Sequence, residues 1–155
     1  MIPIIRKATS EDLPAIFDLV VKLAIYEKEP HAVKTSVEIY QKDFGAGVFE
    51  AHVAEYEGAI VGMMIYYLTY STWRGRMLYL EDFVVRQDKR QLGLGQLLFE
   101  ALIEEGKKKG ARLIKWQVLD WNEPALAFYR KIGATIEKNW WNGKLYLDQG
   151  NEAME

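Results

Sequence analysis

The sequence contains no cysteine among its 155 residues. This absence excludes disulfide bonds, thiolate metal sites and a cysteine nucleophile that would carry an acyl group. The two histidines, His31 and His52, are isolated in the sequence. The residues therefore predict no metal site, and any group transfer should proceed without a cysteinyl intermediate.

An excess of basic charge is also missing, because the formal net charge is −2. Proteins that bind nucleic-acid backbones usually carry a basic excess, so we expect no nucleic-acid partner. A small cationic substrate would suit this balance better. No apolar run approaches the roughly 20 residues that span a bilayer, and the N-terminal segment lacks the pattern of a signal peptide. We expect a cytoplasmic protein with no membrane partner.

The remaining composition is that of a globular protein, with 50% hydrophobic and 27% charged residues. A chain of this length fits one domain with one core. No repeat, low-complexity tract or linker interrupts it. We therefore expect a single domain over residues 1–155.

Hydrophobic periodicity and turn signals predict the order of elements. Thr9 and Asp12 fit a capping box at the start of the first helix, and Asn142-Gly143 is a strong hairpin signal. The predicted strands cover 2–8, 49–56, 59–70, 76–87, 112–119, 134–141 and 144–148, and the predicted helices cover 10–24, 36–43, 94–109 and 122–132. This order predicts an α/β (α+β) fold, with a mixed, mostly antiparallel sheet of about seven strands flanked by about four helices.

The segment Leu78–Gly95 runs from a strand through a glycine-containing turn into an amphipathic helix. Such a turn presents backbone N–H groups and the positive end of the helix dipole, an arrangement that binds phosphate. Gly93 and Gly95 would allow close approach, and Arg90 adds a cation. The P-loop and dinucleotide patterns are both absent. The spacing alone leaves a turn without a ligand equally open.

Glu81 and Asp82 are consecutive in a predicted strand, so their side chains should point to opposite faces of the sheet. Their neighbours are apolar, and carboxylates in such surroundings cost free energy unless they have partners or a chemical role. One alternative is that each forms an ion pair with a basic residue of an adjacent strand.

Residues 90–95, RQLGLG, match the [QR]-x-x-G-x-[GA] coenzyme A signature of the GNAT superfamily of N-acetyltransferases. Residues 122–133 add the pattern N-E-P-x-x-x-F-Y-x-x-x-G. The chain resembles most the spermidine/spermine (diamine) N-acetyltransferase branch, through YLEDF at 79–83, Trp73, RKAT at 6–9 and LAIYE at 23–27. The resemblance covers essentially the whole chain and implies the GNAT fold.

The resemblance implies acetyl-coenzyme A as the acetyl donor, with no metal. Its pantetheine arm would contact the backbone at Phe83, Val84 and Val85, where the strand separates from its neighbour. The pyrophosphate would lie on the loop formed by Arg90, Gln91, Leu92, Gly93, Leu94, Gly95 and Gln96. Asn122 and Tyr129 would also contact the coenzyme, although Asn122 is equally suited to a plain helix N-cap.

The resemblance also assigns catalytic roles. Tyr129 would protonate the coenzyme A thiolate as a general acid; the alternative is an aromatic residue on a buried helix face. Glu81 would accept the proton of the attacking amine, through water, and Asp82 would bind a substrate ammonium. Trp73 and Glu27 are further candidates for binding the acceptor.

The acceptor itself stays open. Ser71 stands where polyamine enzymes of this branch carry an acidic residue, which leaves room for a shorter diamine or a lysine-like amine such as thialysine. Another amine, such as a peptide N-terminus, and a non-catalytic acyl-coenzyme A sensor are the alternatives. The branch also implies a homodimer, with the aromatic surface of Trp140, Trp141 and Tyr146 as the expected interface.

Overall fold

The structure is a computed structural model that describes residues 2–148. Its contacts divide the chain into two compact parts, Met1–Gln117 and Val118–Glu155, which are described separately. The single domain over residues 1–155 therefore stays a prediction. Among the described residues, no helix has both the length and the apolar character needed to cross a membrane. The cytoplasmic location also stays a prediction.

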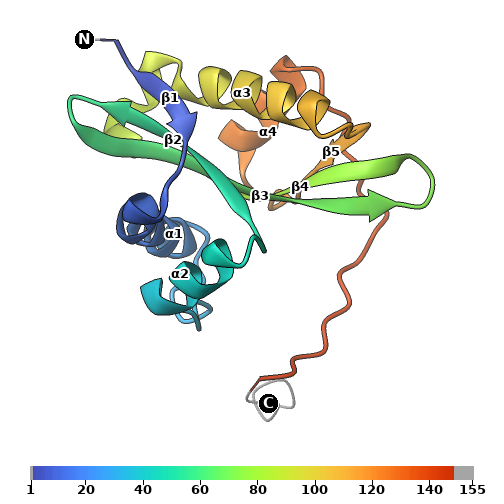
Figure 1. The fold of residues 1–155 in the computed structure, drawn as a ribbon. Coiled ribbons are helices and arrows are strands. Elements are labelled where there is room, and N and C mark those ends of the chain that lie inside the picture. The colour runs from blue at the N-terminus through green and yellow to red at the C-terminus, as the bar shows by residue number, and fades with distance from the viewer. Residues whose placement is uncertain (1, 149–155) are drawn as a thin grey trace. The chain divides into compact units, whose positions relative to one another are not determined.

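The first part is a five-stranded sheet with helices on both faces (Figure 1). The strands lie in the order β1-β2-β3-β4-β5, and each neighbouring pair is antiparallel except β4 and β5, which are parallel. Helices α1 and α2 lie on one face and α3 lies on the other. The elements are β1 (Ile4–Lys7), the 3-10 turn η1 (Ser10–Asp12), α1 (Leu13–Tyr26), α2 (Val37–Gly45), β2 (Glu50–Tyr56), β3 (Ala59–Ser71), β4 (Gly75–Val85), the 3-10 turn η2 (Gln87–Leu92), α3 (Leu94–Lys108) and β5 (Leu113–Lys115).

The core on the α1 face follows from the spacing of apolar residues along that helix. Leu13, Ile16 and Leu19 recur at intervals of three residues and are fully or almost fully buried. They pack against alternate residues of three strands: Ala51 and Val53 of β2, Met63 and Ile65 of β3, and Val84 of β4. This alternation defines which side chains of each strand face α1.

The turn between β2 and β3 lies at Glu57-Gly58, the two residues between the predicted strands 49–56 and 59–70. Both residues adopt positive φ, at 53° and 78°, which is the requirement of the two-residue turn that matches the twist of paired strands. Glycine meets this requirement without steric cost. The sheet register is thereby set at the tip of the hairpin, where Tyr56 faces Ala59.

The expectation of about seven strands is wrong for the described residues, which contain five. The second part contains α4 (Glu123–Lys131), but residues 134–148 form neither of the two predicted strands. An isolated two-stranded hairpin is only marginally stable in water, so the Asn142-Gly143 signal is insufficient without a neighbouring strand. Strand β5 is also shorter than the predicted 112–119.

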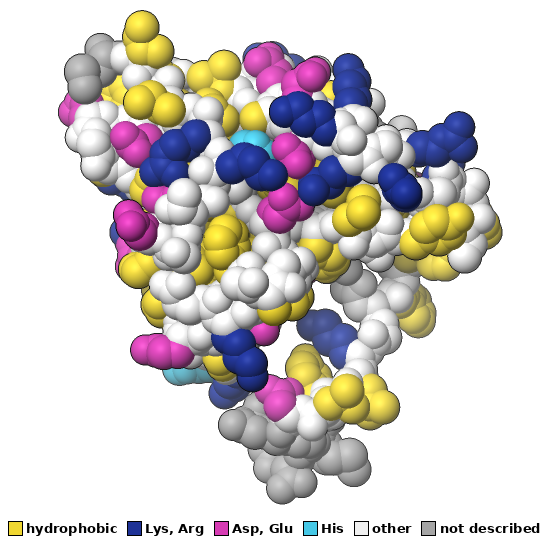
Figure 2. All heavy atoms as spheres, in the orientation of Figure 1, with side chains coloured by type: hydrophobic (Ala, Val, Ile, Leu, Met, Phe, Trp, Pro, Cys, Tyr) yellow, Lys and Arg dark blue, Asp and Glu magenta, His cyan; other side chains and the backbone are white. Residues whose placement is uncertain are grey.

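The face of the sheet under α3 carries a polar network. The Tyr66 hydroxyl lies 2.8 Å from Nδ1 of His52, and the two buried rings are stacked. Near them, Lys109 pairs with Glu50 at 2.7 Å and with Glu105 at 3.5 Å. Acidic and basic side chains accordingly alternate on the face drawn in Figure 2. Burial lowers the pKa of His52 below its usual value, so this histidine is neutral at neutral pH.

A second ionic cluster joins β1 to the start of α1. Arg6 donates two hydrogen bonds to the Asp12 carboxylate, at 2.8 and 3.0 Å, and a third to Glu55 at 3.0 Å. The Thr9 backbone N–H also donates to Asp12, at 2.8 Å, which confirms the predicted capping box. The hydrogen bonds from Arg6 hold the pKa of Asp12 below its ordinary value.

We expect Asp12→Asn to lower the free energy of unfolding at pH 7 by about 1.5–3 kcal/mol, since hydrogen bonds to a charged group are lost. The stabilisation from a carboxyl with a depressed pKa is complete above its unfolded pKa and is lost as the pH falls through the folded-state value. The difference between variant and wild type should therefore shrink in acid. Urea unfolding across this pH range measures it.

Asp18→Asn is the matched control, because Asp18 forms an exposed ion pair with Lys22 at 3.0 Å on α1. Such pairs contribute about 0–1 kcal/mol. Equal losses in the two variants would contradict the assigned role of Asp12.

Candidate active site

An extra residue interrupts the pairing of β3 with β4. Ile65 faces Asp82 and Tyr66 faces Leu80, so Glu81 has no opposing residue of its own. This is a β-bulge, which leaves the extra residue unpaired and bends the strand. The bulge changes the side-chain alternation of β4 at one point, between Leu80 and Asp82.

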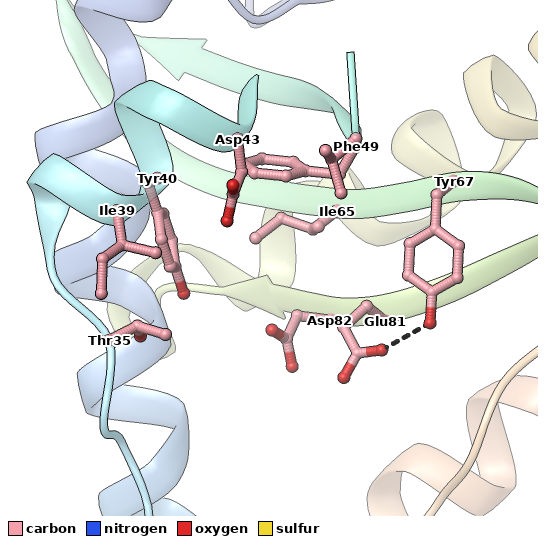
Figure 3. Close-up of a pocket in the computed structure, with 10 residues that line it drawn as sticks. Thr35, Ile39, Tyr40, Asp43, Phe49, Ile65, Tyr67, Glu81 and Asp82 are labelled. Carbon is pink, nitrogen blue, oxygen red and sulfur yellow. Dashed lines mark hydrogen bonds between the residues drawn. The ribbon is translucent and has the colours of Figure 1, made fainter. Parts of the chain in front are cut away.

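The predicted orientation of Glu81 and Asp82 toward opposite faces is therefore wrong. Glu81 continues the alternation of Tyr79, whereas Asp82 continues that of Val84, a residue of the core under α1. Because the bulge lies between the two alternations, Glu81 and Asp82 both point to the face of the sheet that α1 covers. Figure 3 shows the two carboxylates side by side at one cavity.

The cavity has a volume of about 210 Å³ and lies between α2 and the sheet. It combines aromatic and aliphatic walls with carboxylates from α2 and β4. Its lining residues are Thr35, Ile39, Tyr40, Asp43, Val48, Phe49, Ile65, Tyr67, Glu81 and Asp82. All ten belong to the part Met1–Gln117. Clefts with apolar walls and a few polar groups are the usual form of small-molecule sites.

The cavity shifts the pKa of the Asp82 carboxyl group away from its ordinary value. Burial, together with the negative charges of Glu81 and Glu27, raises the pKa of Asp82 to about 7. Burial also raises the pKa of Glu27, which follows the last residue of α1. Glu27 does not line the cavity, but its charge acts on Asp82. Perturbed carboxyl groups in a cleft are typical of functional sites.

Glu81 is held by a tyrosine of the neighbouring strand. The Tyr67 hydroxyl donates a hydrogen bond to Oε1 of Glu81 at 3.0 Å (Figure 3). The Tyr67 ring stacks on Tyr79, with ring centroids 5.6 Å apart. Burial, together with this hydrogen bond, raises the pKa of Tyr67, so its hydroxyl stays protonated and remains a donor. The Glu81 carboxylate is thereby oriented at the edge of the cavity.

The predicted phosphate-binding turn has the expected geometry. Gly93 adopts a φ of 73° between η2 and α3, a conformation that glycine tolerates best. Leu97 donates the first backbone bond of α3 to the Gly93 carbonyl, at 3.3 Å. The N–H groups of Leu94, Gly95 and Gln96 precede it and have no carbonyl partner within the helix, which is the arrangement that binds phosphate groups.

The pairing of β4 with β5 ends before the expected pantetheine contacts. The two strands pair only at Met77–Tyr79 among the described residues. Beyond them, Phe83, Val84 and Val85 are paired with β3 on the other side. Phe83 contacts the Phe99 ring of α3, with centroids 5.4 Å apart, whereas Val84 belongs to the core under α1.

Arg90 is placed differently from a simple phosphate-binding cation. Its Nε donates to the Val85 carbonyl at 3.1 Å, and its guanidinium lies 5.7 Å from the centre of the Tyr26 ring. Arg90 therefore connects η2 to the end of β4 and to α1. The neighbouring Arg86 is bound to Asp88 at 2.7 Å.

The remaining candidates are not among the residues that line the cavity. Trp73 lies in the β3–β4 turn with 86% of its surface exposed. In the second part, Asn122 caps α4 by accepting a hydrogen bond from the Ala125 N–H at 3.4 Å. Tyr129 lies on the same helix, where its ring contacts Phe128 edge to face. The structure thus brings Glu81 and Asp82 together, and the roles of all these residues stay predictions.

Several lining residues of the cavity were missed by the sequence interpretation, among them the polar residues Tyr40 and Asp43 of α2. Tyr40 and Asp43 are three residues apart on α2 and therefore share a face of the helix. Their spacing within the predicted helix 36–43 was the available signal. No pattern in the sequence indicated which face of that helix would meet the sheet.

Comparison with known proteins agrees with this geometry. Residues 13–134 match the acetyltransferase (GNAT) family. A thialysine N-epsilon-acetyltransferase of Bos taurus is 38% identical over 140 residues, covering 84% of this chain and 82% of the relative. A spermidine/spermine N(1)-acetyltransferase-like protein 1 of Homo sapiens is 30% identical over 148 residues, covering 88% of this chain but 21% of the relative.

A solved structure supports the fold. An aminoglycoside acetyltransferase from an uncultured soil metagenomic sample superimposes with a TM-score of 0.78 and 23% identity, covering 94% of this chain and 97% of that structure. The similarity at this identity concerns the fold alone. The family match extends over most of the chain and agrees with the glycine turn at the start of α3. The chain belongs to the GNAT family of N-acetyltransferases.

Proposed function

We propose that this acetyltransferase moves the acetyl group of acetyl-coenzyme A to a primary amine of a small cationic acceptor, a diamine, a polyamine or a lysine-like amine. The observation that carries the proposal is the pair Glu81 and Asp82. The bulge in β4 turns both carboxylates into one cavity, and the same strand leads into the glycine turn. An acidic cavity favours an amine over a neutral or anionic acceptor.

The relatives support this class of acceptor. Their names describe acetylation of thialysine and, for the human protein, a likeness to spermidine/spermine acetyltransferases. A relative of Arabidopsis thaliana, 32% identical over 82 residues, is named for acetylation of L-ornithine. All these acceptors are aliphatic and carry more than one amino group.

The described residues fit acetyl-coenzyme A, whose thioester would supply the activated acetyl group. The N–H groups at Leu94, Gly95 and Gln96 suit a pyrophosphate, and Gln91, Leu92 and Gly93 form the preceding turn. No atom lies within 4 Å of the position that a Cβ would take on Gly93, so the turn is open to a ligand. The backbone of Phe83–Val85 and the side chain of Asn122 complete the proposed contacts.

Proton transfer is assigned to two residues. Alkylamines are mostly protonated near neutral pH, so the attacking nitrogen must lose a proton. Glu81, oriented by Tyr67, would accept it through a water molecule, and Tyr129 would donate a proton to the sulfur that leaves. Asp82, with the nearby Glu27, would attract the cationic acceptor. Trp73 does not line the cavity, and its contact with the acceptor stays a prediction. The absence of cysteine favours direct transfer in a ternary complex.

The first test is thiol release from acetyl-coenzyme A with putrescine, spermidine, thialysine, lysine and a short peptide as acceptors. We expect turnover with a small diamine or a lysine-like amine. Tyr129→Phe should lower kcat by about 10²–10⁴, the usual contribution of a general acid, with little change in coenzyme affinity. Phe128→Leu is the control for packing on the same helix.

Coenzyme binding without turnover for any amine would contradict the proposed reaction and favour the acyl-coenzyme A sensor. Full activity of Tyr129→Phe would remove Tyr129 as the acid and leave the proposed reaction intact.

The raised pKa of Asp82 predicts a pH dependence of acceptor binding. A carboxyl group with a pKa of about 7 is charged mainly above that pH, so the affinity for a cation should rise as the pH increases through 7. We expect the acceptor KM to fall by about fivefold to tenfold between about pH 6 and about pH 8. Asp82→Asn should raise KM and abolish this step, while the KM of the coenzyme stays constant.

The same shift predicts the effect of Asp82→Asn on stability. A carboxyl whose folded pKa is raised makes the protein less stable as the pH rises from its unfolded to its folded pKa. The variant should therefore unfold at a higher temperature than wild type at pH 8 and at a similar temperature at pH 4. A lower unfolding temperature at pH 8 would contradict the burial of an unpaired charge.

A single domain and a homodimer are the proposed organisation. The family match over residues 13–134 includes residues of both parts, which supports one domain. Trp140 and Trp141 are 69% and 96% exposed, and such apolar surface is typical of interfaces.

Sedimentation velocity should give a dimer for the wild type, and a Trp140→Ser/Trp141→Ser double variant should shift the distribution toward the monomer. The dimer prediction fails if wild type sediments as a monomer at the same concentrations.

A further inference from the structure

Asp43 is a third carboxylate at the cavity and lies on the wall opposite β4. It projects from α2, whereas Asp82 projects from β4, and Figure 3 shows the two side chains on either side of the same space. The sequence analysis gave Asp43 no role. The reaction proposed above uses Glu81 and Asp82 and leaves Asp43 unexplained.

The position of Asp43 is determined by aromatic packing. Tyr40, one turn earlier on α2, contacts Phe17 of α1 and Phe49 edge to face, with ring centroids 5.2 and 5.8 Å apart. Phe44, the residue after Asp43, also contacts Phe49, at 5.6 Å. The Asp43 backbone carbonyl accepts a hydrogen bond from Val48 at 2.9 Å. These contacts hold Asp43 in a fixed position. A fixed position is what a residue needs if it is to select ligands by their length.

The charge in the cavity is not balanced by the described part of the protein. Its ten lining residues contain three carboxylates and no lysine, arginine or histidine. The ion pairs among the described residues include the buried Asp12 and Glu105 and the half-buried Glu50, but none includes Asp43, Glu81 or Asp82. Glu81 is exposed, whereas Asp43 and Asp82 are partly buried. Carboxylates partly withdrawn from water are stabilised by a cation, and here a ligand can supply it.

The walls next to these carboxylates are suited to the rest of such a ligand. Tyr40, Phe49 and Ile65 present apolar surface between Asp43 and Asp82. Aromatic faces attract ammonium groups, and aliphatic side chains accommodate methylene chains. The cavity therefore combines a site for a positive charge with a site for a short hydrocarbon chain.

We propose that Asp43 determines acceptor specificity by binding, together with Asp82, the remote ammonium group of the acceptor, while the reacting amine lies at Glu81. The inference rests on the proposed acetyl transfer to an amine. It narrows the acceptor to an amine with a second positive charge and without a carboxylate beside that charge. A carboxylate there would face Asp43 and Asp82 with no cation in the lining to balance it.

Three amines that share one five-carbon chain test this inference. Cadaverine has an ammonium group at each end, pentylamine lacks the remote one, and lysine adds a carboxylate beside it. For wild type, we expect kcat/KM to be highest for cadaverine and on the order of tenfold or more lower for each of the other two. The difference should reside in KM, since the reacting amine is the same.

Asp43→Asn should lower kcat/KM for cadaverine on the order of tenfold, through KM, and leave pentylamine unchanged. Asp43→Glu keeps the charge and should retain most of the preference for cadaverine. Glu38→Gln is the matched control, because Glu38 is an exposed carboxylate of the same helix and does not line the cavity. Thermal unfolding of each variant separates these effects from a loss of folding.

The inference is overturned if wild type uses pentylamine or lysine as well as cadaverine, or if Asp43→Asn affects cadaverine and pentylamine equally. If wild type acetylates none of the three, the proposed reaction fails for this class, and titration calorimetry of the same amines decides the role of Asp43 separately. Weaker cadaverine binding by Asp43→Asn alone would then support the inference, and unchanged binding would overturn it.

Discussion

The bulge at Glu81 is the constraint on which the cavity depends. Leu78 and Leu80 face α3, whereas Val84 faces α1, so β4 contributes to the core on both sides of the sheet. The alternation of its side chains between the two faces changes at one point, the bulge. That change is what allows two consecutive carboxylates to point the same way. A regular strand would place one of them against α3, where Leu78 and Leu98 pack. The backbone geometry of one residue thus decides the electrostatics of the site.

The carboxylates that stabilise the fold and those at the cavity are held in different ways. Acidic groups that support the structure, such as Asp12 and Glu50, are paired with Arg6 and with Lys109. Those at the cavity are held by aromatic packing and a tyrosine hydrogen bond instead. Rigid apolar surroundings keep the carboxylates in place at some cost in stability, a cost that a bound cation would offset.

Much of the fold could be predicted because the signals are local. The capping box at Thr9, the turn at Glu57-Gly58 and the glycine turn before Leu94 each depend on a few neighbouring residues. The bulge could not be predicted, because register depends on both strands and on the layers that cover them. The tail with Asn142-Gly143 has a turn signal but forms no strand among the described residues, and Asp43 joins the cavity only through the packing of α2. Both depend on contacts between segments distant in the sequence.

The contacts of Arg90 define the path of η2, which leads into the proposed coenzyme-binding turn. Its bonds to the Val85 carbonyl and the Tyr26 ring are made within the protein, so the path of η2 is defined without help from a ligand. A loop that is already ordered loses little conformational entropy when a ligand arrives. The chain meets that entropic cost during folding, so a ligand of the kind proposed for this turn would meet a preformed binding surface.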